Sequence, residues 1–340
     1  MKPTILCTLP LEKSLQEQLR RKARAYNVKC VSVRNSQDVD DALDASVEIL
    51  LTGAAPTRLE NAPALRWVQM NSAGINHVMQ SPIYLREDLS LTTARGVYDV
   101  AGAEFTVGLM LSLTKRFKLA LESQQARKWC PNSERLNVYP NQELRGRSVG
   151  IIGYGGIGQE IARLCNAFGM KTFALVRHNK KPGEARYRLP ELRRLRAPVL
   201  EKVFEFPRGL GPLIERSDFV IVTLPLTPET EGLIDKSALG RMHKDAYFIN
   251  VSRGPLVKEE ALAEVLREGA IAGAALDVFE QEPLPENSPF WNLKNVIVTP
   301  HISGVFTGMW ERVVALFVEN LERYRGGKTL FNLVNRRRGY

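Results

Sequence analysis

Short apolar runs alternate with amphipathic stretches through the first hundred residues of the chain. The apolar runs have the length of β-strands, and they cover Ile5–Leu9, Lys29–Val33, Glu48–Thr52, Arg66–Met70 and Ser90–Thr93. Between the first two runs, apolar positions repeat at helical spacing over Pro10–Tyr26, which predicts an amphipathic helix. Strands that alternate with helices are typical of parallel βαβ units. The region therefore predicts a small open α/β domain.

The middle of the chain contains a strongly apolar segment followed by an irregular one. Ala101–Ser123 is strongly apolar with few charges before Lys115, which predicts one long helix buried between domains. Arg127–Arg147 follows without a clear period and contains Trp129 and two prolines. This irregular stretch predicts either a linker or an arm that packs on another subunit.

A second and stronger alternation begins at Val149. Helices are expected over Ile157–Phe168 and Lys258–Glu268, and Gly169 and Gly269 suit their C-terminal caps. The strand candidates are apolar on both faces, as central parallel strands covered by helices are. They are Val149–Gly153, Thr172–Val176, Phe219–Thr223, Ala246–Val251, Ala272–Val278 and Val296–Thr299. A last amphipathic helix is expected over Val305–Arg325.

Length and composition restrict the class of protein. The chain has 340 residues, which exceeds one ordinary domain of about 100–200 residues and predicts two. No apolar run approaches the roughly 18–20 residues of a membrane span, and the N-terminal segment lacks a signal-peptide pattern. Cys7, Cys30, Cys130 and Cys165 are scattered, without CxxC or metal-ligand spacing. We therefore expect a cytoplasmic protein that takes no metal and does not bind membranes.

Positive charge is concentrated in two short segments. The chain has 47 Lys and Arg against 37 Asp and Glu, a net charge of +10. Arg177–Arg196 carries +6 of this excess and Arg336–Arg338 carries +3. An excess of this kind suggests an anionic partner such as nucleic acid, a membrane surface, a phosphorylated cofactor or an acidic substrate. Because no nucleic-acid-binding motif is present, we expect the last two rather than nucleic acid.

A glycine motif follows the strand that begins at Val149. Gly153, Gly155 and Gly158 form G-x-G-x-x-G between an apolar strand and an apolar-periodic helix, a context that favours a dinucleotide-binding loop over a glycine-rich turn without a ligand. Gly153 allows the tight turn, Gly155 lets the backbone approach a pyrophosphate, and Gly158 lets the helix pack closely on the strand. The N-terminus of the helix then offers its N–H groups to the phosphates.

The end of the next strand carries positive charge where an NAD site has a carboxylate. The sequence there runs from Val176 to Arg177 and His178 and then to two lysines. A cationic cluster suits the 2′-phosphate of NADP, with Arg177 as its bidentate ligand. The alternative is a solvated basic loop on an NAD enzyme. We expect NADP(H) to be preferred, with NAD(H) possible.

Three chemically capable residues follow three later strands. Arg253, Glu282 and His301 lie in loops just past the strand ends, and ligands of open α/β sheets bind at the carboxyl ends of strands. Arginine can hold a substrate carboxylate or carbonyl, histidine can act as general acid or base, and a carboxylate beside the histidine stabilises its imidazolium form. Taken alone, each of these three residues could equally be a surface or capping residue without a catalytic role. Together they predict a site for 2-oxoacid reduction.

With these motifs, the chain resembles the D-2-hydroxyacid dehydrogenase family, the D-isomer-specific group. The resemblance extends over nearly the whole chain, and it is strongest in Val149–Ala162, Ser217–Thr230, Phe248–Val257, Gly273–Pro285 and Val298–Gly304. It implies two doubly wound parallel-sheet domains with the active-site cleft between them. A smaller flavodoxin-like substrate domain would comprise residues 1–100 and 302–340, and a Rossmann domain that binds NAD(P) would comprise residues 101–301.

The resemblance also implies roles for single residues. Arg253 would bind and orient the substrate, Glu282 would be the partner of the histidine, and His301 would be the acid/base. Backbone N–H groups of the loop Ser72, Ala73 and Gly74 would hold the substrate carboxylate, unless this loop is a simple turn, and Trp310 would shape the pocket or else pack in the core. The implied cofactor-binding residues are Tyr154, Gly155, Gly156, Ile157, Arg177, His178, Leu224, Pro225, Thr230, Val251, Ser252, Arg253, Asp277, His301 and Gly304. Of these, Asp277 would meet the nicotinamide carboxamide.

One departure from the family pattern supports NADP, because Val176 stands where NAD-dependent members carry aspartate. The pattern is most similar to glyoxylate/hydroxypyruvate reductase-like members. We therefore expect an NADPH-dependent reductase of small 2-oxoacids that acts as a homodimer. Two alternatives remain, a formate- or phosphite-type dehydrogenase on the same scaffold and a non-catalytic, dinucleotide-sensing corepressor-like protein.

Overall fold

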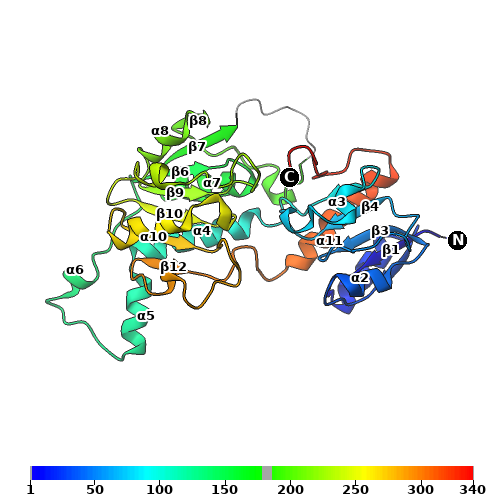
Figure 1. The fold of residues 1–340 in the computed structure, drawn as a ribbon, viewed down its shortest axis with the longest axis horizontal. Coiled ribbons are helices and arrows are strands. Elements are labelled where there is room, and N and C mark those ends of the chain that lie inside the picture. Colours follow the sequence, from blue (N-terminus) through cyan, green and yellow to red (C-terminus); the bar gives the residue numbers. More distant parts are fainter. Residues whose placement is uncertain (1, 178–185, 340) are drawn as a thin grey trace. The chain divides into compact units, whose positions relative to one another are not determined.

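The computed structural model describes residues 2–177 and 186–339, which fold into two compact units. The first unit is drawn from Met1–Tyr98, Lys181–Arg194 and Phe306–Tyr340, and the second from Asp99–Lys180 and Leu195–Val305. Each unit has its own parallel sheet (Figure 1). The prediction of a two-domain α/β fold with two parallel sheets is confirmed.

The first unit is built on a five-stranded parallel sheet. Its strands are β1 (Thr4–Cys7), β2 (Asn27–Cys30), β3 (Val47–Thr52), β4 (Trp67–Met70) and β5 (Ser90–Thr92). They are ordered β2-β1-β3-β4-β5. This is the strand order of flavodoxin-like folds, so the sequence prediction for this domain is confirmed. The central strands are buried at every position except Glu48, which explains why they are mostly apolar on both faces.

Helices from both ends of the chain cover this sheet. They are α1 (Lys13–Lys22), α2 (Ser36–Ala42), α3 (Pro82–Leu85) and the last helix, α11 (Met309–Arg325). The last helix is held by buried contacts with β4, since Phe317 stacks on Trp67 at a centroid distance of 5.0 Å and the amide of Asn320 donates to Gln69 Oε1 at 3.0 Å. The C-terminal helix thus completes the core of the domain in which the chain begins.

The second unit is built on a seven-stranded parallel sheet. Its strands are β6 (Ser148–Ile152), β7 (Lys171–Arg177), β8 (Lys202–Phe206), β9 (Phe219–Val222), β10 (Tyr247–Asn250), β11 (Gly273–Leu276) and β12 (Val296–Val298). They are ordered β12-β11-β10-β9-β6-β7-β8, so the winding direction reverses between β6 and β9. Ligands of doubly wound sheets bind at this switch point, beyond the carboxyl ends of the strands.

The helices of the second unit include one that differs from its prediction. They are α4 (Asp99–Thr114), α5 (Phe117–Gln125), α6 (Arg135–Val138), α7 (Gly156–Ala167), α8 (Leu210–Ile214), α9 (Lys236–Leu239) and α10 (Glu259–Arg267). The single long helix expected over Ala101–Ser123 is wrong, because Arg116 takes a left-handed conformation (φ 55°) and divides it into α4 and α5. Of these two helices, α4 contributes buried side chains and packs against α7, whereas α5 has no buried side chain.

Strand β8 has no counterpart in the predicted strands. It lies at the edge of the sheet, and Lys202, Val203 and Glu205 are exposed. The strand prediction rested on continuous apolar runs, which a solvated edge strand does not have. Its pairing with β7 is therefore a tertiary feature.

Residues 186–194, which follow β7 in the chain, belong to the first unit. The prediction assigned them to the Rossmann domain. They join the first unit because Tyr187 is buried there, with its N–H donated to Asn332 Oδ1 at 3.1 Å, and because Arg193 forms an ion pair with Glu319 at 2.8 Å. A connection between two strands of one sheet thus helps to build the other unit.

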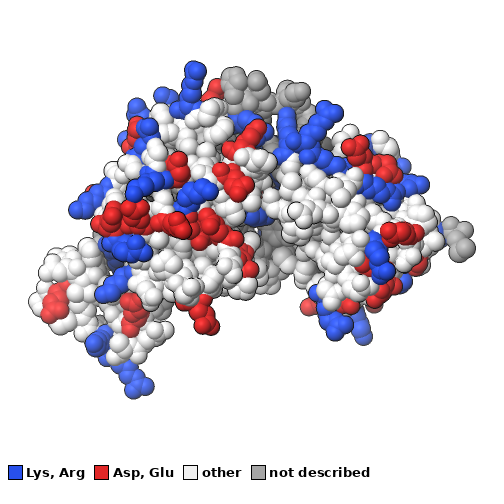
Figure 2. All heavy atoms as spheres, in the orientation of Figure 1, with Lys and Arg blue, Asp and Glu red and all other residues white. Residues whose placement is uncertain are grey.

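One arginine of the basic segment Arg336–Arg338 is engaged in structural contacts. Arg336 donates hydrogen bonds to four backbone carbonyls around α3, those of Ile83, Tyr84, Arg86 and Leu89. On the face shown in Figure 2, acidic side chains gather over the part of the second unit that carries α10. No described helix is both long and apolar enough to cross a membrane.

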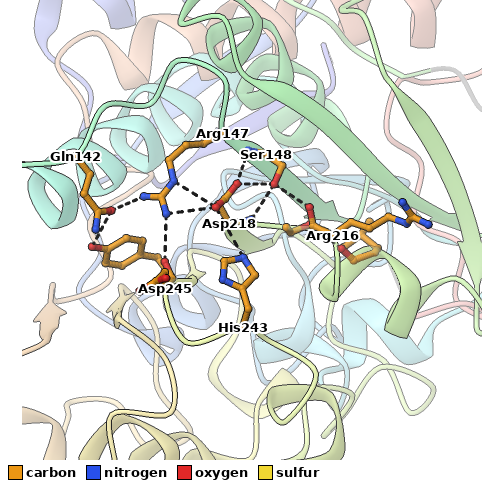
Figure 3. A network of polar contacts seen from close by, with 10 residues as sticks. Gln142, Arg147, Ser148, Arg216, Asp218, His243 and Asp245 are labelled. Atoms are coloured by element: carbon orange, nitrogen blue, oxygen red, sulfur yellow. Dashed lines mark hydrogen bonds and ion pairs between the residues drawn. The ribbon is translucent and has the colours of Figure 1, made fainter.

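A polar network ties the amino ends of β6 and β9 together (Figure 3). The carboxylate of Asp218 accepts bonds from the Ser148 N–H and hydroxyl, both at 2.7 Å, and is paired with Arg147 at 3.3 Å. Burial alone would raise the pKa of Asp218, but the Ser148 bonds and the Arg147 charge outweigh it and lower the pKa. His243 lies 3.8 Å from the same carboxylate. This network holds the sheet at the edge opposite the carboxyl ends of its strands.

Asp218→Asn should therefore destabilise the protein by about 1–3 kcal/mol at neutral pH, because the amide N–H groups would face other donors. A carboxyl whose folded pKa is lowered stabilises the fold above its unfolded pKa of about 3.9 and loses this effect as pH falls through the folded value. Urea unfolding of both proteins should show the difference at pH 7 and a smaller difference at pH 3. A constant difference across this range would contradict the proposed role of the carboxylate.

Candidate active site

The glycine loop begins where β6 ends, at the switch point of the second sheet. Gly153 has a left-handed φ of 104°, and a β-carbon placed on it would lie 3.0 Å from the backbone nitrogen of Leu224. A β-carbon on Gly158 would come under 3.0 Å from the carbonyl oxygen of Gly153. Both positions thus require glycine, one for the turn and one for close packing of α7 on the loop.

The middle of this loop is open. A β-carbon on Gly155 would meet nothing within 4 Å, and α7 has no side-chain cap at its N-terminus. A β-carbon on Gly156 would come under 3.0 Å from the carboxylate of Asp99, so a larger residue there would require the Asp99 side chain to shift. An open backbone at an uncapped helix N-terminus fits a pyrophosphate group. The loop therefore has the shape that a dinucleotide needs.

The cationic residue predicted to select the cofactor lies at the end of the next strand. Arg177 is the last residue of β7, and its guanidinium forms an ion pair with Glu229 at 2.6 Å. Val176 precedes it and is half-buried. His178, the other predicted ligand of the 2′-phosphate, lies outside the described residues.

Arg253 is placed just past β10 by its neighbours. The side chain of Asn250 donates to the Arg253 carbonyl at 2.9 Å and accepts the Ser252 N–H at 3.1 Å. Burial lowers the pKa of Arg253, and the charge of Glu282 opposes this effect. The guanidinium stays protonated in any case, so the site contains a permanent, half-buried cation.

Glu282 and His301 form a close pair. Nδ1 of His301 lies 2.7 Å from one carboxylate oxygen of Glu282, and the other oxygen accepts the N–H of Phe279 at 3.0 Å. Both side chains remain partly exposed. A carboxylate bonded to one ring nitrogen orients the imidazole and leaves Nε2 for proton exchange with a substrate. Arg253, Glu282 and His301 are thus brought together at one edge of the sheet.

Asp277 holds the loop that carries His301. Its fully buried carboxylate accepts the hydroxyl of Thr299 at 2.6 Å and the N–H groups of Ile302 and Ser303, each at 2.9 Å. His301 itself has a left-handed φ of 53° and donates its N–H to the Asp277 carbonyl at 2.8 Å. The structure gives Asp277 a positioning role, while its predicted contact with the nicotinamide carboxamide stays a prediction.

Two further residues position the site and were not identified from the sequence. A β-carbon on Gly254 would lie well under 3.0 Å from the backbone carbonyl of Phe279, so the Arg253 and Glu282 loops touch backbone to backbone. Glu259 accepts the N–H of Glu280 at 2.6 Å, and burial raises its pKa. The only sequence signal for the contact between these two loops is that a glycine, Gly254, directly follows Arg253.

The other predicted cofactor residues also belong to the second unit. Ser252 donates its hydroxyl to the Leu224 carbonyl, and Thr230 donates its hydroxyl to the Pro225 carbonyl at 2.8 Å. The Ser252 bond ties the loop after β10 to the loop after β9, and the Thr230 bond lies within the loop after β9. Val251 is buried, whereas Tyr154, Ile157 and Gly304 are half-buried.

The predicted substrate loop and Trp310 belong to the first unit. The loop follows β4, and the Ser72 hydroxyl donates to the Gly74 carbonyl at 2.8 Å. The Ser72 carbonyl accepts the N–H of Ala94 at 2.8 Å, and the hydroxyl of Tyr98 donates to the carbonyl of Asn71. Trp310 lies half-buried near the start of α11.

The glycine loop and the oriented imidazole of His301 lie at the carboxyl edge of one parallel sheet. This arrangement is typical of NAD(P)-dependent oxidoreductases. A model of the NAD binding domain of the D-isomer specific 2-hydroxyacid dehydrogenases matches residues 107–303. The chain belongs to this family, as its sequence resemblance predicted.

Relatives and solved structures agree with this assignment. The chain is 34% identical over 315 residues to a glyoxylate reductase of Thermofilum pendens, covering 89% of this chain and 84% of that protein. It is 36% identical over 282 residues to a glyoxylate reductase of Aeropyrum pernix, covering 82% and 78%. A D-isomer specific 2-hydroxyacid dehydrogenase from Xanthobacter autotrophicus, solved with NADPH and MES, superposes over both full chains with a TM-score of 0.79 and 26% identity. An NADPH-dependent glyoxylate/hydroxypyruvate reductase from Sinorhizobium meliloti, solved with NADP and sulfate, superposes over both full chains with a TM-score of 0.76 and 25% identity.

Proposed function

We propose that the protein reduces small 2-oxoacids of the glyoxylate and hydroxypyruvate type to D-2-hydroxyacids with NADPH. The observation that carries this proposal is the 2.7 Å pair of His301 and Glu282 beside the half-buried cation Arg253. This set lies in the same unit as the glycine loop, whose shape fits a dinucleotide. The names of the glyoxylate reductase relatives support the substrate class.

The residues of this chain would share the work as follows. Arg253 binds the substrate carboxylate or carbonyl through its planar fork. His301 donates a proton from Nε2 to the carbonyl oxygen, and Glu282 stabilises the imidazolium before transfer and fixes the ring. The nicotinamide, when bound, supplies the hydride to the carbonyl carbon. Ser72, Ala73, Gly74 and Trp310 of the first unit remain proposed substrate-binding residues.

A panel assay tests this function. NADPH oxidation should be measured with glyoxylate, hydroxypyruvate and larger 2-oxoacids, with NADH in parallel. Turnover with formate or phosphite and NADP in place of these substrates would favour the second dehydrogenase class. Dinucleotide binding without turnover of any compound would favour a binding protein of the corepressor-like kind.

The preference for NADPH rests on Arg177 at the end of β7. A charge-assisted hydrogen bond to the 2′-phosphate contributes about 1.5–3 kcal/mol, so Arg177→Ala should raise the KM for NADPH roughly 10- to 100-fold. The KM for NADH should change little. Glu229→Gln is the matched control, because it removes the ion-pair partner of Arg177 and should not raise the KM for NADPH. A wild-type protein that uses both cofactors equally, or prefers NADH, would contradict the proposal.

We also propose that the protein is a homodimer that uses the segment from α5 to α6. No side chain of α5 or α6 is buried, and these helices extend away from the sheet of their unit (Figure 1). Trp129 and Leu136 are each 86% exposed, and Phe117 and Leu121 are more than half exposed. Apolar side chains at this density mark a protein contact surface. Sedimentation of the wild type and of Leu136→Glu should show a dimer that the charge weakens.

A further inference from the structure

Two cysteines of the first unit end neighbouring strands of its sheet. Cys7 is the last residue of β1 and Cys30 the last residue of β2, and the two are paired directly in the parallel register. Paired strands lie about 4.8 Å apart, and a disulfide needs Cα atoms roughly 4.4–6.8 Å apart. Directly paired residues of parallel strands point to the same face. The two thiols are therefore within reach of each other, although 22 residues separate them in the sequence.

The two thiols differ in access to solvent. Cys7 is fully buried, whereas Cys30 is partly exposed on β2, the edge strand of the sheet. An edge strand is hydrogen-bonded on one side only. The accessible thiol thus lies at the edge of the sheet.

The surroundings of the two thiols also shift their pKa values in opposite directions. A hydrogen bond with Cys7 and the positive charge of Arg20 on α1 lower the pKa of Cys30 to about 7, although burial opposes them. The same hydrogen bond and burial raise the pKa of Cys7. At neutral pH, Cys30 therefore carries a substantial thiolate fraction beside a protonated Cys7 thiol. The thiolate is the reactive form of cysteine.

We propose that Cys7 and Cys30 form an oxidant-responsive dithiol, in which Cys30 reacts with the peroxide and Cys7 is the resolving thiol. The Cys30 thiolate attacks a peroxide oxygen, the O–O bond breaks, and the products are a Cys30 sulfenic acid and hydroxide. The Cys7 sulfur then attacks the Cys30 sulfur, and the S–S bond forms as water leaves with the Cys7 proton. Each disulfide consumes one hydrogen peroxide, which is reduced to water. The two cysteines belong to the first unit, whereas Arg253, Glu282 and His301 belong to the second, and the proposal does not depend on the proposed function.

The experiment uses the full-length, fully reduced protein with Cys130→Ser, which removes the cysteine of the α5–α6 segment as a source of intermolecular disulfides. After exposure to hydrogen peroxide, the protein is denatured, alkylated and weighed by mass spectrometry. Of its three remaining thiols, only one should be alkylated. Tryptic digestion should yield a cross-link between residues 1–13 and 30–34 that a reductant separates. Iodoacetamide should modify Cys30 with a half-maximal rate near pH 7.

Two variants separate the roles of the sulfurs. Cys7→Ala should leave a Cys30 sulfenic acid that dimedone traps, with no disulfide. Cys30→Ser should leave Cys7 unoxidised under the same treatment. Three alkylatable thiols after peroxide, a cross-link that contains Cys165, or Cys30 oxidised to sulfinic acid in the protein that retains Cys7 would each overturn the proposal.

Discussion

His301→Ala should lower kcat by about 10²–10⁴-fold, the range that a positioned general acid contributes. The dissociation constant of NADPH should stay nearly the same, because the glycine loop and Arg177 are separate from this side chain in the sequence and in their contacts. Single-turnover NADPH oxidation measures the chemical step, and a fluorescence titration measures cofactor affinity. A variant that keeps most of its activity would refute the acid/base role.

The backbone of His301 requires a second variant as a control. Its φ of 53° lies in the left-handed region, which costs most non-glycine residues roughly 1–2 kcal/mol and which asparagine tolerates better than alanine. His301→Asn should therefore keep the conformation of the loop on Asp277 and still lose kcat to a similar extent. If His301→Asn were active while His301→Ala was not, the loss would come from the loop and not from proton transfer.

Gly254→Ala should lower both stability and turnover. Its β-carbon would lie well under 3.0 Å from the carbonyl of Phe279, and both collision partners are backbone, so neither can rotate away. Overpacking costs about 1–3 kcal/mol and sometimes more. Relief of the collision would move the Phe279–Glu282 loop away from Arg253, and the carboxylate that orients His301 would move with it. Urea unfolding and kcat should therefore change together.

Gly155→Ala is the matched control for this change. A β-carbon on Gly155 would meet nothing within 4 Å, so stability without cofactor should stay within about 0.5 kcal/mol of the wild type. The same methyl group would lie where a pyrophosphate is expected, so NADPH should bind more weakly. An unfolding midpoint of Gly254→Ala equal to that of Gly155→Ala would show that the loop contact is not rigid.

Much of the site could be predicted because its signals are local. The glycine loop is contiguous, and Arg253, Glu282 and His301 each follow a recognisable apolar strand. The carboxyl ends of parallel strands share one edge of a sheet, so residues far apart in the chain could be assigned to one site without coordinates. The partners that fix these residues could not be assigned in this way. Asp277 and Gly254 act through contacts between separate loops.

The sequence by itself determined the two α/β units, most of their strands and the residues with catalytic chemistry, because hydrophobic periodicity and loop motifs are properties of short segments. Only the tertiary structure decided the break at Arg116, the pairing of β8 and the place of residues 186–194 in the first unit. It also paired Cys7 with Cys30, which the sequence showed only as scattered apolar residues. Each of these features depends on which segments become neighbours after folding, and a pattern along the chain does not contain that information.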